Sequence, residues 1–323
     1  MDKIKRIKKR NITIISIFSV IGILVITFLF YWMFALVRVN NFTDINFADL
    51  KTKYDFIKLR QAEIHYVEKG SGNNTIILVH GLGGGTFSFR NNIDALVNAG
   101  YKVFAIDLKG FGFSEKVVGS DYSDIEQAEI ILDFMDKKGI QKTTIAGHSM
   151  GGRIALICYD IRPQSFEKII LIDSAGLEEN SRSLLSNFIT KPLVDIIFYN
   201  LIVKENKFKD FLSSAFYNKE LVNEEVVSLY LKPFKIKNSN LAYLYIIKSN
   251  VYYDIGSVLE KINIPVLIIW GESDSWINVE NAYKFNALIK GSELSIIKDA
   301  GHVPMEEQAE KVNEKIIEFL KKI

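Results

Sequence analysis

One serine in this chain is flanked by glycines at the two positions where a sharp turn would need them. Gly147 and Gly151 stand two residues before and two residues after Ser149, in the stretch AGHSMGG. Glycine has no side chain to collide in a tight connection between a strand and a helix, so this spacing predicts a turn with Ser149 at its apex. A serine hydroxyl presented in this way can attack a carbonyl in acyl transfer. An ordinary glycine-rich turn is the alternative.

A serine hydroxyl is a weak nucleophile until a base takes its proton, and histidine is the usual base because its pKa lies near neutrality. The chain has four histidines. His65 lies on an early predicted hairpin, His80 ends a strand and is expected to support the loop that follows, and His148 points elsewhere on the serine turn. His302, in DAGHVPMEE, lies between the last predicted strand and the last helix. A base placed there can reach the carboxyl end of the sheet, so we predict that His302 is the base.

The base needs a carboxylate that fixes its tautomer and stabilises the imidazolium ion. Asp274 ends the strand and loop VLIIWGESD and is the favoured partner of His302. Asp173, at the end of IILID, is the competing candidate. For either aspartate the simpler interpretation is that it caps the turn after its strand.

Acyl transfer also needs hydrogen-bond donors for the oxyanion that develops on the substrate. One candidate is the backbone N–H of Met150, at the start of a predicted helix where the helix dipole helps. The other is the backbone N–H of Leu82 in HGLGGG, where glycines such as Gly81 let the backbone approach a substrate closely. A phosphate-binding loop is the alternative, but the stretch lacks the lysine of a P-loop and the spacing of a dinucleotide fingerprint.

Short apolar strands alternate with helices along most of the chain, and they must position these residues. FIKLRQAEIHYVEKG predicts two antiparallel strands around a turn near Arg60 and Gln61. The later predicted strands lie in NNTIILVHG, YKVFAIDLKGFGFSE, KTTIAGHSMGG, FEKIILIDSAG, IPVLIIWGESD and SELSIIKDAGH. Helices are expected at about 91–98, 124–138, 279–288 and 306–321. This alternation predicts an α/β fold whose mostly parallel sheet is covered by helices on both faces.

Between Gly176 and Lys261 the alternation stops. This segment is predicted to be a helical cap inserted into one core domain, which is made of residues 54–175 and 262–323. Its apolar side chains are expected to line an acyl pocket or face a bilayer, with the cap's own core as the alternative. They include Phe188, Ile189, Phe198, Tyr199, Phe211 and Tyr243.

The amino terminus is predicted to be a membrane anchor. Residues 12–37 contain no charged side chain. A segment of this length can cross a hydrocarbon core with some tilt. Six Lys and Arg residues lie in the stub 1–11, so the positive-inside bias predicts a cytoplasmic amino terminus and a catalytic domain on the outer side of the cell membrane. Residues 38–53 are expected to form a linker. A cleaved signal peptide is the alternative, but the bulky aromatic stretch at 30–34 makes a poor cleavage site.

The composition excludes several classes of protein. The 323 residues are 48% hydrophobic and 24% charged, with a net charge of +2, so the chain can bury a large core and has no stripe for binding nucleic acid. The single cysteine, Cys158, rules out an intrachain disulfide framework and is expected to be a core residue. No cysteine–histidine cluster has the spacing of metal ligands, so neither a metal nor a cofactor is expected.

Six motifs occur in the order and spacing of the α/β-hydrolase superfamily: HGLGGG, DLKGFGFSE, GHSMGG, LIDSAGL, PVLIIWGESD and DAGHVPMEE. The chain resembles this superfamily from about Phe56 to Phe319, and within it the membrane-anchored, monoacylglycerol lipase-like serine esterases most closely. The resemblance implies that Ser149 is the nucleophile, Asp274 the acid and His302 the base. It also implies a small, lipid-like ester as the substrate, cleaved through an acyl-enzyme.

The resemblance also bears on the other reactions that this superfamily catalyses. A serine instead of an aspartate at 149 argues against haloalkane dehalogenases and epoxide hydrolases, and HGLGGG departs from the HGGPG of proline iminopeptidases. Carbon–carbon bond hydrolases share nearly the same motifs, and a thioester hydrolase would use the same triad. A non-catalytic receptor or scaffold with this fold is the remaining alternative.

Overall fold

The computed structural model describes residues 2–60, 62–177, 190–249 and 251–322. Its strands are β1 (Phe56–Leu59), β2 (Ala62–Lys69), β3 (Asn74–Val79), β4 (Tyr101–Ile106), β5 (Thr143–His148), β6 (Phe166–Ile172), β7 (Val266–Gly271) and β8 (Glu293–Ile297). Over the described residues these eight strands form one sheet in the order β1-β2-β4-β3-β5-β6-β7-β8. The six strands from β4 to β8 in that order run parallel. At one edge of the sheet, β2 is antiparallel to β4, and β1 is antiparallel to β2. The predicted mostly parallel sheet is confirmed.

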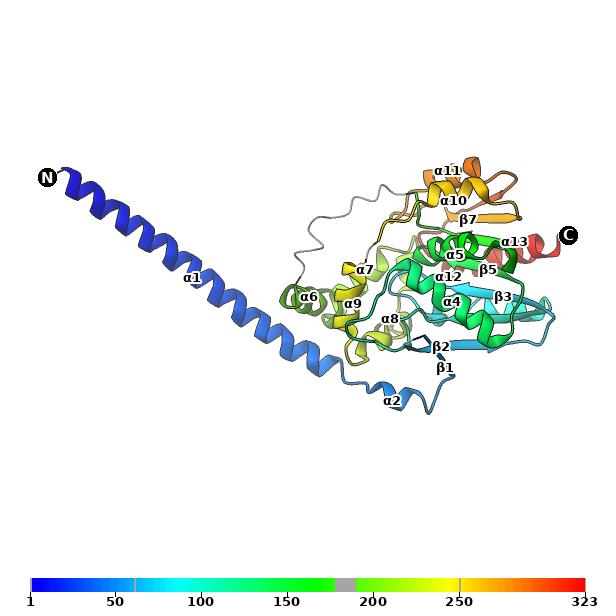
Figure 1. The fold of residues 1–323 in the computed structure, drawn as a ribbon, viewed down its shortest axis with the longest axis horizontal. Helices are drawn as coiled ribbons and strands as arrows, with labels where there is room; N and C mark the ends of the chain where they lie inside the picture. Colours follow the sequence, from blue (N-terminus) through cyan, green and yellow to red (C-terminus); the bar gives the residue numbers. More distant parts are fainter. Residues whose placement is uncertain (1, 61, 178–189, 250, 323) are drawn as a thin grey trace.

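Helices cover both faces of the sheet (Figure 1). On one face lie α4 (Asp124–Lys138), α5 (Met150–Ile161), α10 (Ile255–Lys261) and α11 (Glu280–Leu288), and on the other lie α3 (Ile93–Asn98), α12 (Pro304–Glu307) and α13 (Ala309–Lys321). Successive strand residues point to opposite faces, so Ile77 and Val79 pack with the first group and Ile76 and Leu78 with the second. This fully apolar pattern is what a sheet buried on both sides requires.

The prediction of one continuous helix over 306–321 is wrong. The chain leaves the helical conformation at Gln308, between α12 and α13. The break lets the Glu307 carboxylate accept hydrogen bonds from the backbone N–H groups of Gly301, at 2.6 Å, and Asn218, at 2.9 Å. Two orphan donors in neighbouring loops are thereby satisfied, which offsets the interrupted helix.

The segment between β6 and β7 is helical, as the sequence predicts. It contains α6 (Lys191–Phe198), the π-helical turn η4 (Tyr199–Val203), α7 (Glu205–Ser213), η5 (Lys219–Leu221), α8 (Glu224–Leu231), η6 (Lys232–Lys235) and α9 (Ser239–Lys248). Helix α10, which was assigned to the cap, instead packs with α5 and α11 in the core, because its apolar residues join the cluster under the sheet. Phe188 and Ile189 lie outside the described residues.

The amino-terminal helix α1 (Asp2–Phe42) contains one stretch, Ser16–Phe42, that is long and apolar enough to cross a membrane, with a mean hydropathy of 2.6. The helix continues five residues beyond the predicted end of the span, and α2 (Phe47–Leu50) follows it, so the expected linker 38–53 is partly helical. The reason is that no glycine or proline interrupts the helix there, and Val39 is completely buried.

The carboxyl-terminal part of α1 packs against the cap helix α6 and the turn η4 (Figure 1). The centre of this junction is Asp195, a carboxylate with no solvent exposure. It accepts hydrogen bonds from Trp32 Nε1 at 3.1 Å, Asn240 Nδ2 at 2.7 Å and Lys191 Nζ at 2.7 Å. A buried carboxylate needs such partners, so the junction joins α1, α6 and α9 through specific polar contacts.

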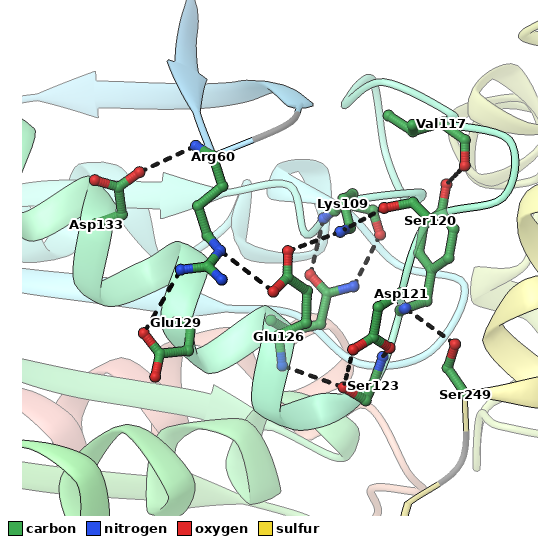
Figure 2. Close-up of polar contacts among 12 residues, drawn as sticks. Arg60, Lys109, Val117, Ser120, Asp121, Ser123, Glu126, Glu129, Asp133 and Ser249 are labelled. Atoms are coloured by element: carbon green, nitrogen blue, oxygen red, sulfur yellow. Dashed lines mark hydrogen bonds and ion pairs between the residues drawn. The ribbon is translucent and has the colours of Figure 1, made fainter.

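The loop after β4 is held against α4 by buried charge (Figure 2). The Lys109 side chain is almost fully buried and pairs with Glu126 at 2.9 Å. Arg60, at the turn between β1 and β2, pairs with the other oxygen of Glu126 at 3.2 Å and donates its backbone N–H to Asp133. One carboxylate therefore connects the sheet edge, the loop and the helix. Gln61, the other predicted turn residue, lies outside the described residues.

Candidate active site

Ser149 lies at the sharp turn between β5 and α5. Its backbone has φ 53° and ψ −121°, a conformation that non-glycine residues rarely adopt. A Cβ atom on Gly147 would lie 2.2 Å from the Gly151 carbonyl oxygen, and one on Gly151 would lie 2.3 Å from the Val79 carbonyl oxygen. Backbone atoms cannot give way easily, so both glycines are required for the turn that presents Ser149.

Ser149, His302 and Asp274 form a continuous row of hydrogen bonds. His302 Nε2 lies 3.0 Å from Ser149 Oγ, and His302 Nδ1 lies 2.8 Å from Asp274 Oδ2. The other oxygen of Asp274 accepts the backbone N–H groups of Trp276 and Ile277 at 2.8 and 3.0 Å. These bonds fix the carboxylate, which in turn fixes the tautomer of the imidazole with its proton on Nδ1.

Hydrogen bonds to the backbone hold His302 in place. Its backbone N–H donates to the Ala215 carbonyl at 2.7 Å, which is a contact with the loop after α7. Its carbonyl oxygen accepts a hydrogen bond from His148 Nε2 at 2.7 Å. Burial, together with the neighbouring His302, lowers the pKa of His148 to about 3. His148 is therefore a neutral positioning group near pH 7, and it does not face Ser149 Oγ as a base.

The lowered pKa of His148 should make the stability of the protein depend on pH. We expect the free energy of unfolding to decrease as the pH is lowered from about 6.5 towards 3, because the unfolded chain protonates His148 in this window and the folded chain does not. Urea unfolding of the detergent-solubilised protein at a series of pH values measures the effect. The His148→Gln variant cannot titrate here and should show a shallower dependence. Equal slopes in the two proteins would contradict the assignment.

The two competing aspartates occupy different electrostatic environments. Burial raises the pKa of Asp274, but the hydrogen bond and charge of His302 and two backbone N–H groups outweigh it and leave the pKa below its ordinary value. Burial raises the pKa of Asp173 well above its usual range, and the nearby Asp274 carboxylate raises it further. Asp173 accepts the Gly271 N–H at 2.9 Å and makes no hydrogen bond to His302. The surroundings of Asp274 thus favour its charged form, and those of Asp173 favour its neutral form.

Asp173, Asp274 and His302 also lie close enough together to resemble a metal site, with one ligand atom from each within 4.8 Å of the others. The hydrogen bond between His302 and Asp274 already accounts for their closeness. His302 Nδ1 is directed at Asp274 instead of a shared centre. This group therefore fits a proton-transfer site better than a metal site.

The loop after β3 brings Leu82 to the same site. Gly81 and Leu82 line a cavity with Ser149 and His302, and the Gly84 N–H closes the loop on the Gly81 carbonyl. His80 supports this loop because its Nδ1 lies 2.7 Å from the Gly81 carbonyl and its Nε2 accepts the Leu108 N–H.

Met150 is the first residue of α5, where a backbone N–H has no acceptor within the helix. Met150 directly follows Ser149 and Leu82 lines the same cavity, and the role of their backbone N–H groups as oxyanion donors stays a prediction.

Two cavities with shared lining residues lie beneath the cap, and Ser149 lines the first of them. The catalytic cavity, of about 50 Å³, contains Ser149 and His302. The apolar cavity, of about 160 Å³, is lined mainly by cap residues. The two share Leu82, Gly83, Phe211, Phe234 and Trp276. Phe198, Phe211 and Tyr243, which the sequence suggested as pocket residues, line the apolar cavity. Tyr199 instead contacts α1 through Tyr31 and Phe34.

No sequence pattern points to Trp276, which lines both cavities. Its ring is tilted 31° from the His302 ring with centroids 5.1 Å apart, and its other neighbour is Phe211 at 5.2 Å. Its indole N–H donates to Ser214 Oγ in the cap. The tryptophan was missed because its contacts depend on where the cap lies, which no local pattern encodes.

The fold and this arrangement are those of a hydrolase. The sequence profile described as alpha/beta hydrolase fold matches residues 74–309, and the chain belongs to that family. The predicted α/β-hydrolase fold is confirmed.

Three similar proteins differ in what they are named for. The uncharacterized hydrolase YugF of Bacillus subtilis (strain 168) is 30% identical over 257 residues, 80% of this chain and 93% of that protein. A 2-hydroxy-6-oxononadienedioate/2-hydroxy-6-oxononatrienedioate hydrolase of Klebsiella pneumoniae is 28% identical over 270 residues, 81% of this chain and 92% of the relative. The crystal structure of a bacterial membrane phospholipase A superimposes with a TM-score of 0.67 at 26% identity, covering 85% of this chain and 90% of that one.

Proposed function

We propose that the protein is a membrane-anchored serine hydrolase that cleaves lipid-like carboxylic esters, such as monoacylglycerols, through an acyl-enzyme. The observation that carries the proposal is the hydrogen-bonded row of Ser149, His302 and Asp274, whose serine and histidine line a cavity that adjoins a larger apolar cavity. An ester has an acyl half and an alcohol half, and two adjoining cavities, one of which contains the nucleophile, offer room for both.

The first half of the reaction forms the acyl-enzyme. Ser149 Oγ attacks the ester carbonyl carbon while His302 Nε2 takes its proton, and Asp274 stabilises the resulting imidazolium. The backbone N–H groups of Leu82 and Met150 hold the tetrahedral oxyanion. The bond from carbon to the alcohol oxygen then breaks, and His302 gives its proton to the departing alcohol.

The second half releases the acid. Water attacks the acyl-enzyme while His302 again takes a proton, and the returning proton restores the Ser149 hydroxyl. The product is a carboxylic acid, and each bond broken is matched by one formed. This sequence needs no group beyond the side chains and backbone donors already described.

The apolar cavity supports a lipid-like acyl chain. Its described lining is aliphatic and aromatic, with Tyr243 supplying its one side-chain hydroxyl. On its cap side, Ile197 and Leu201 are each about two-fifths exposed, close to the face that packs against α1. An apolar helix beside an apolar opening favours a substrate that comes from a membrane. We place the amino terminus in the cytoplasm and the catalytic domain on the outer side of the cell membrane.

Carbon–carbon bond hydrolysis is the second candidate because of the relative from Klebsiella pneumoniae. The substrate in that relative's name is a dioate, which carries two negative charges. Among the described residues that line the two cavities, none is a lysine or an arginine. A doubly charged substrate would be poorly compensated there, which favours a neutral ester.

Hydrolysis of p-nitrophenyl esters from acetate to palmitate, together with 1-monoacylglycerols, tests the proposal. We expect kcat/KM to increase with acyl-chain length, because each buried CH₂ contributes about 0.8 kcal/mol, or up to about fourfold. Ser149→Ala serves as the control for background hydrolysis. Activity confined to short esters would support a serine hydrolase but contradict a lipid-like substrate. No activity together with no fluorophosphonate labelling of Ser149 would indicate a non-catalytic receptor or scaffold.

A further inference from the structure

The catalytic cavity has one polar wall that the mechanism does not use. Among its described lining residues, three carry hydroxyl groups: Ser149, Ser88 and Tyr230. Ser88 lies in the short helix η1 (Thr86–Phe89), and Tyr230 lies in the cap helix α8. Both are buried, at 2% and 8% exposure, although they border the cavity. This wall is therefore positioned to meet one half of a substrate bound at Ser149.

Hydrogen bonds fix the direction in which these hydroxyl groups point. The Tyr230 hydroxyl donates to Glu306, whose side chain is almost completely buried and whose second oxygen accepts from the Arg90 guanidinium. The Gly85 N–H donates to Ser88 Oγ at 3.4 Å, and Ser88 lines the same cavity as Tyr230. The Tyr230 hydroxyl hydrogen is thus already used. What Tyr230 still offers to a ligand is an oxygen lone pair, and Ser88 Oγ adds a second acceptor.

Such a wall selects for hydrogen-bond donors without negative charge. A free hydroxyl on the ligand can donate to these oxygens, whereas a phosphate or a carboxylate brings only acceptors. Arg90, which pairs with Glu306 behind Tyr230, also donates to the Phe87 carbonyl, so its charge is already compensated. A phosphate-bearing head group would therefore lose its hydration without gaining a partner.

We propose that Ser88 and Tyr230 form a subsite for the alcohol half of the ester, and that this alcohol is neutral and carries at least one free hydroxyl group, as glycerol does. The acyl chain then occupies the apolar cavity, and the scissile carbonyl lies between the two at Ser149. This inference rests on the proposed function as an ester hydrolase, and it adds the selectivity of the enzyme for the leaving alcohol.

The test compares three esters of one acyl chain: monolauroylglycerol, methyl laurate and lauroyl-lysophosphatidylcholine. The wild-type protein is expected to prefer monolauroylglycerol over both others in kcat/KM. Tyr230→Phe should lower the preference for monolauroylglycerol over methyl laurate about tenfold, the size expected from one lost hydrogen bond of about 1.4 kcal/mol. Ser88→Ala should act in the same direction, and it keeps the test valid if the tyrosine variant fails to fold.

The matched control is Tyr243→Phe, the same substitution in the apolar cavity. It should change kcat/KM for monolauroylglycerol and for methyl laurate by the same factor, so the ratio between these two substrates stays unchanged. An unchanged ratio in both Tyr230→Phe and Ser88→Ala would overturn the subsite, and so would an equal loss in Tyr243→Phe. A wild-type preference for the lysophospholipid would overturn the neutral head group. Each of these results leaves the hydrolase intact, whereas no turnover of any ester and no labelling of Ser149 would remove the proposed function and the subsite together.

Discussion

Replacing Ser149 by alanine is expected to lower kcat by about 10⁶-fold on any ester that the wild-type protein cleaves. The substitution removes the atom that forms the acyl-enzyme, and the donors of Leu82 and Met150 can then act only on direct attack by water. The same variant should lose labelling by a fluorophosphonate probe, because His302 Nε2 no longer has a hydroxyl at 3.0 Å to activate.

A matched serine separates this effect from general damage. Ser257→Ala removes a hydroxyl from α10, where it bonds to the Asp254 carbonyl and lies outside both cavities. Its activity and labelling should equal those of the wild-type protein. Labelling that persists in Ser149→Ala would show that another residue is the nucleophile, and the proposed mechanism would then be wrong.

The second large effect distinguishes the two aspartates. Asp274→Asn is expected to lower kcat by about 10⁴-fold, because an amide holds His302 in the wrong tautomer and cannot balance the imidazolium charge. Asp173→Asn should cost less than about tenfold. Burial raises the pKa of its carboxyl group and so favours the neutral form, and an amide of the same shape can keep the bond from the Gly271 N–H.

Both variants are compared by single-turnover kinetics, which isolates formation of the acyl-enzyme. Circular dichroism and thermal unfolding check that each protein has folded. Asparagine at 274 also retains an oxygen for the Trp276 and Ile277 N–H groups, so the loop should keep its conformation. A crippled Asp173→Asn beside a nearly normal Asp274→Asn would reverse the assignment of the acid.

The parts of the site that sequence predicts are those that depend on local rules. The glycines around Ser149 are dictated by backbone collisions within a few residues, and these can be read from their spacing. His302 was predicted because the carboxyl ends of parallel strands meet at one edge of the sheet, so residues far apart in the chain converge there. The order of strands and helices therefore identified the three side chains that the structure brings into contact.

The parts that were missed depend on where the cap lies. Tyr230 reaches Glu306, and Trp276 reaches Phe211, only because α7 and α8 fold back over the sheet. The lengths and directions of cap helices are not encoded in periodicity, so the sequence could not place these contacts. The extension of α1 to Phe42 was missed in part for the same reason, since Val39 and Phe42 pack against apolar side chains of the cap.

The junction at Asp195 has a consequence for how such an enzyme would meet its substrate. If α1 spans a bilayer as we propose, its bonds to the cap would hold the catalytic cavity at a fixed height above the lipid head groups. Encounters would then occur by lateral diffusion in a plane. The mole fraction of substrate in that leaflet, instead of its concentration in the surrounding water, would set the rate, and the released fatty acid would stay within reach as a competitor.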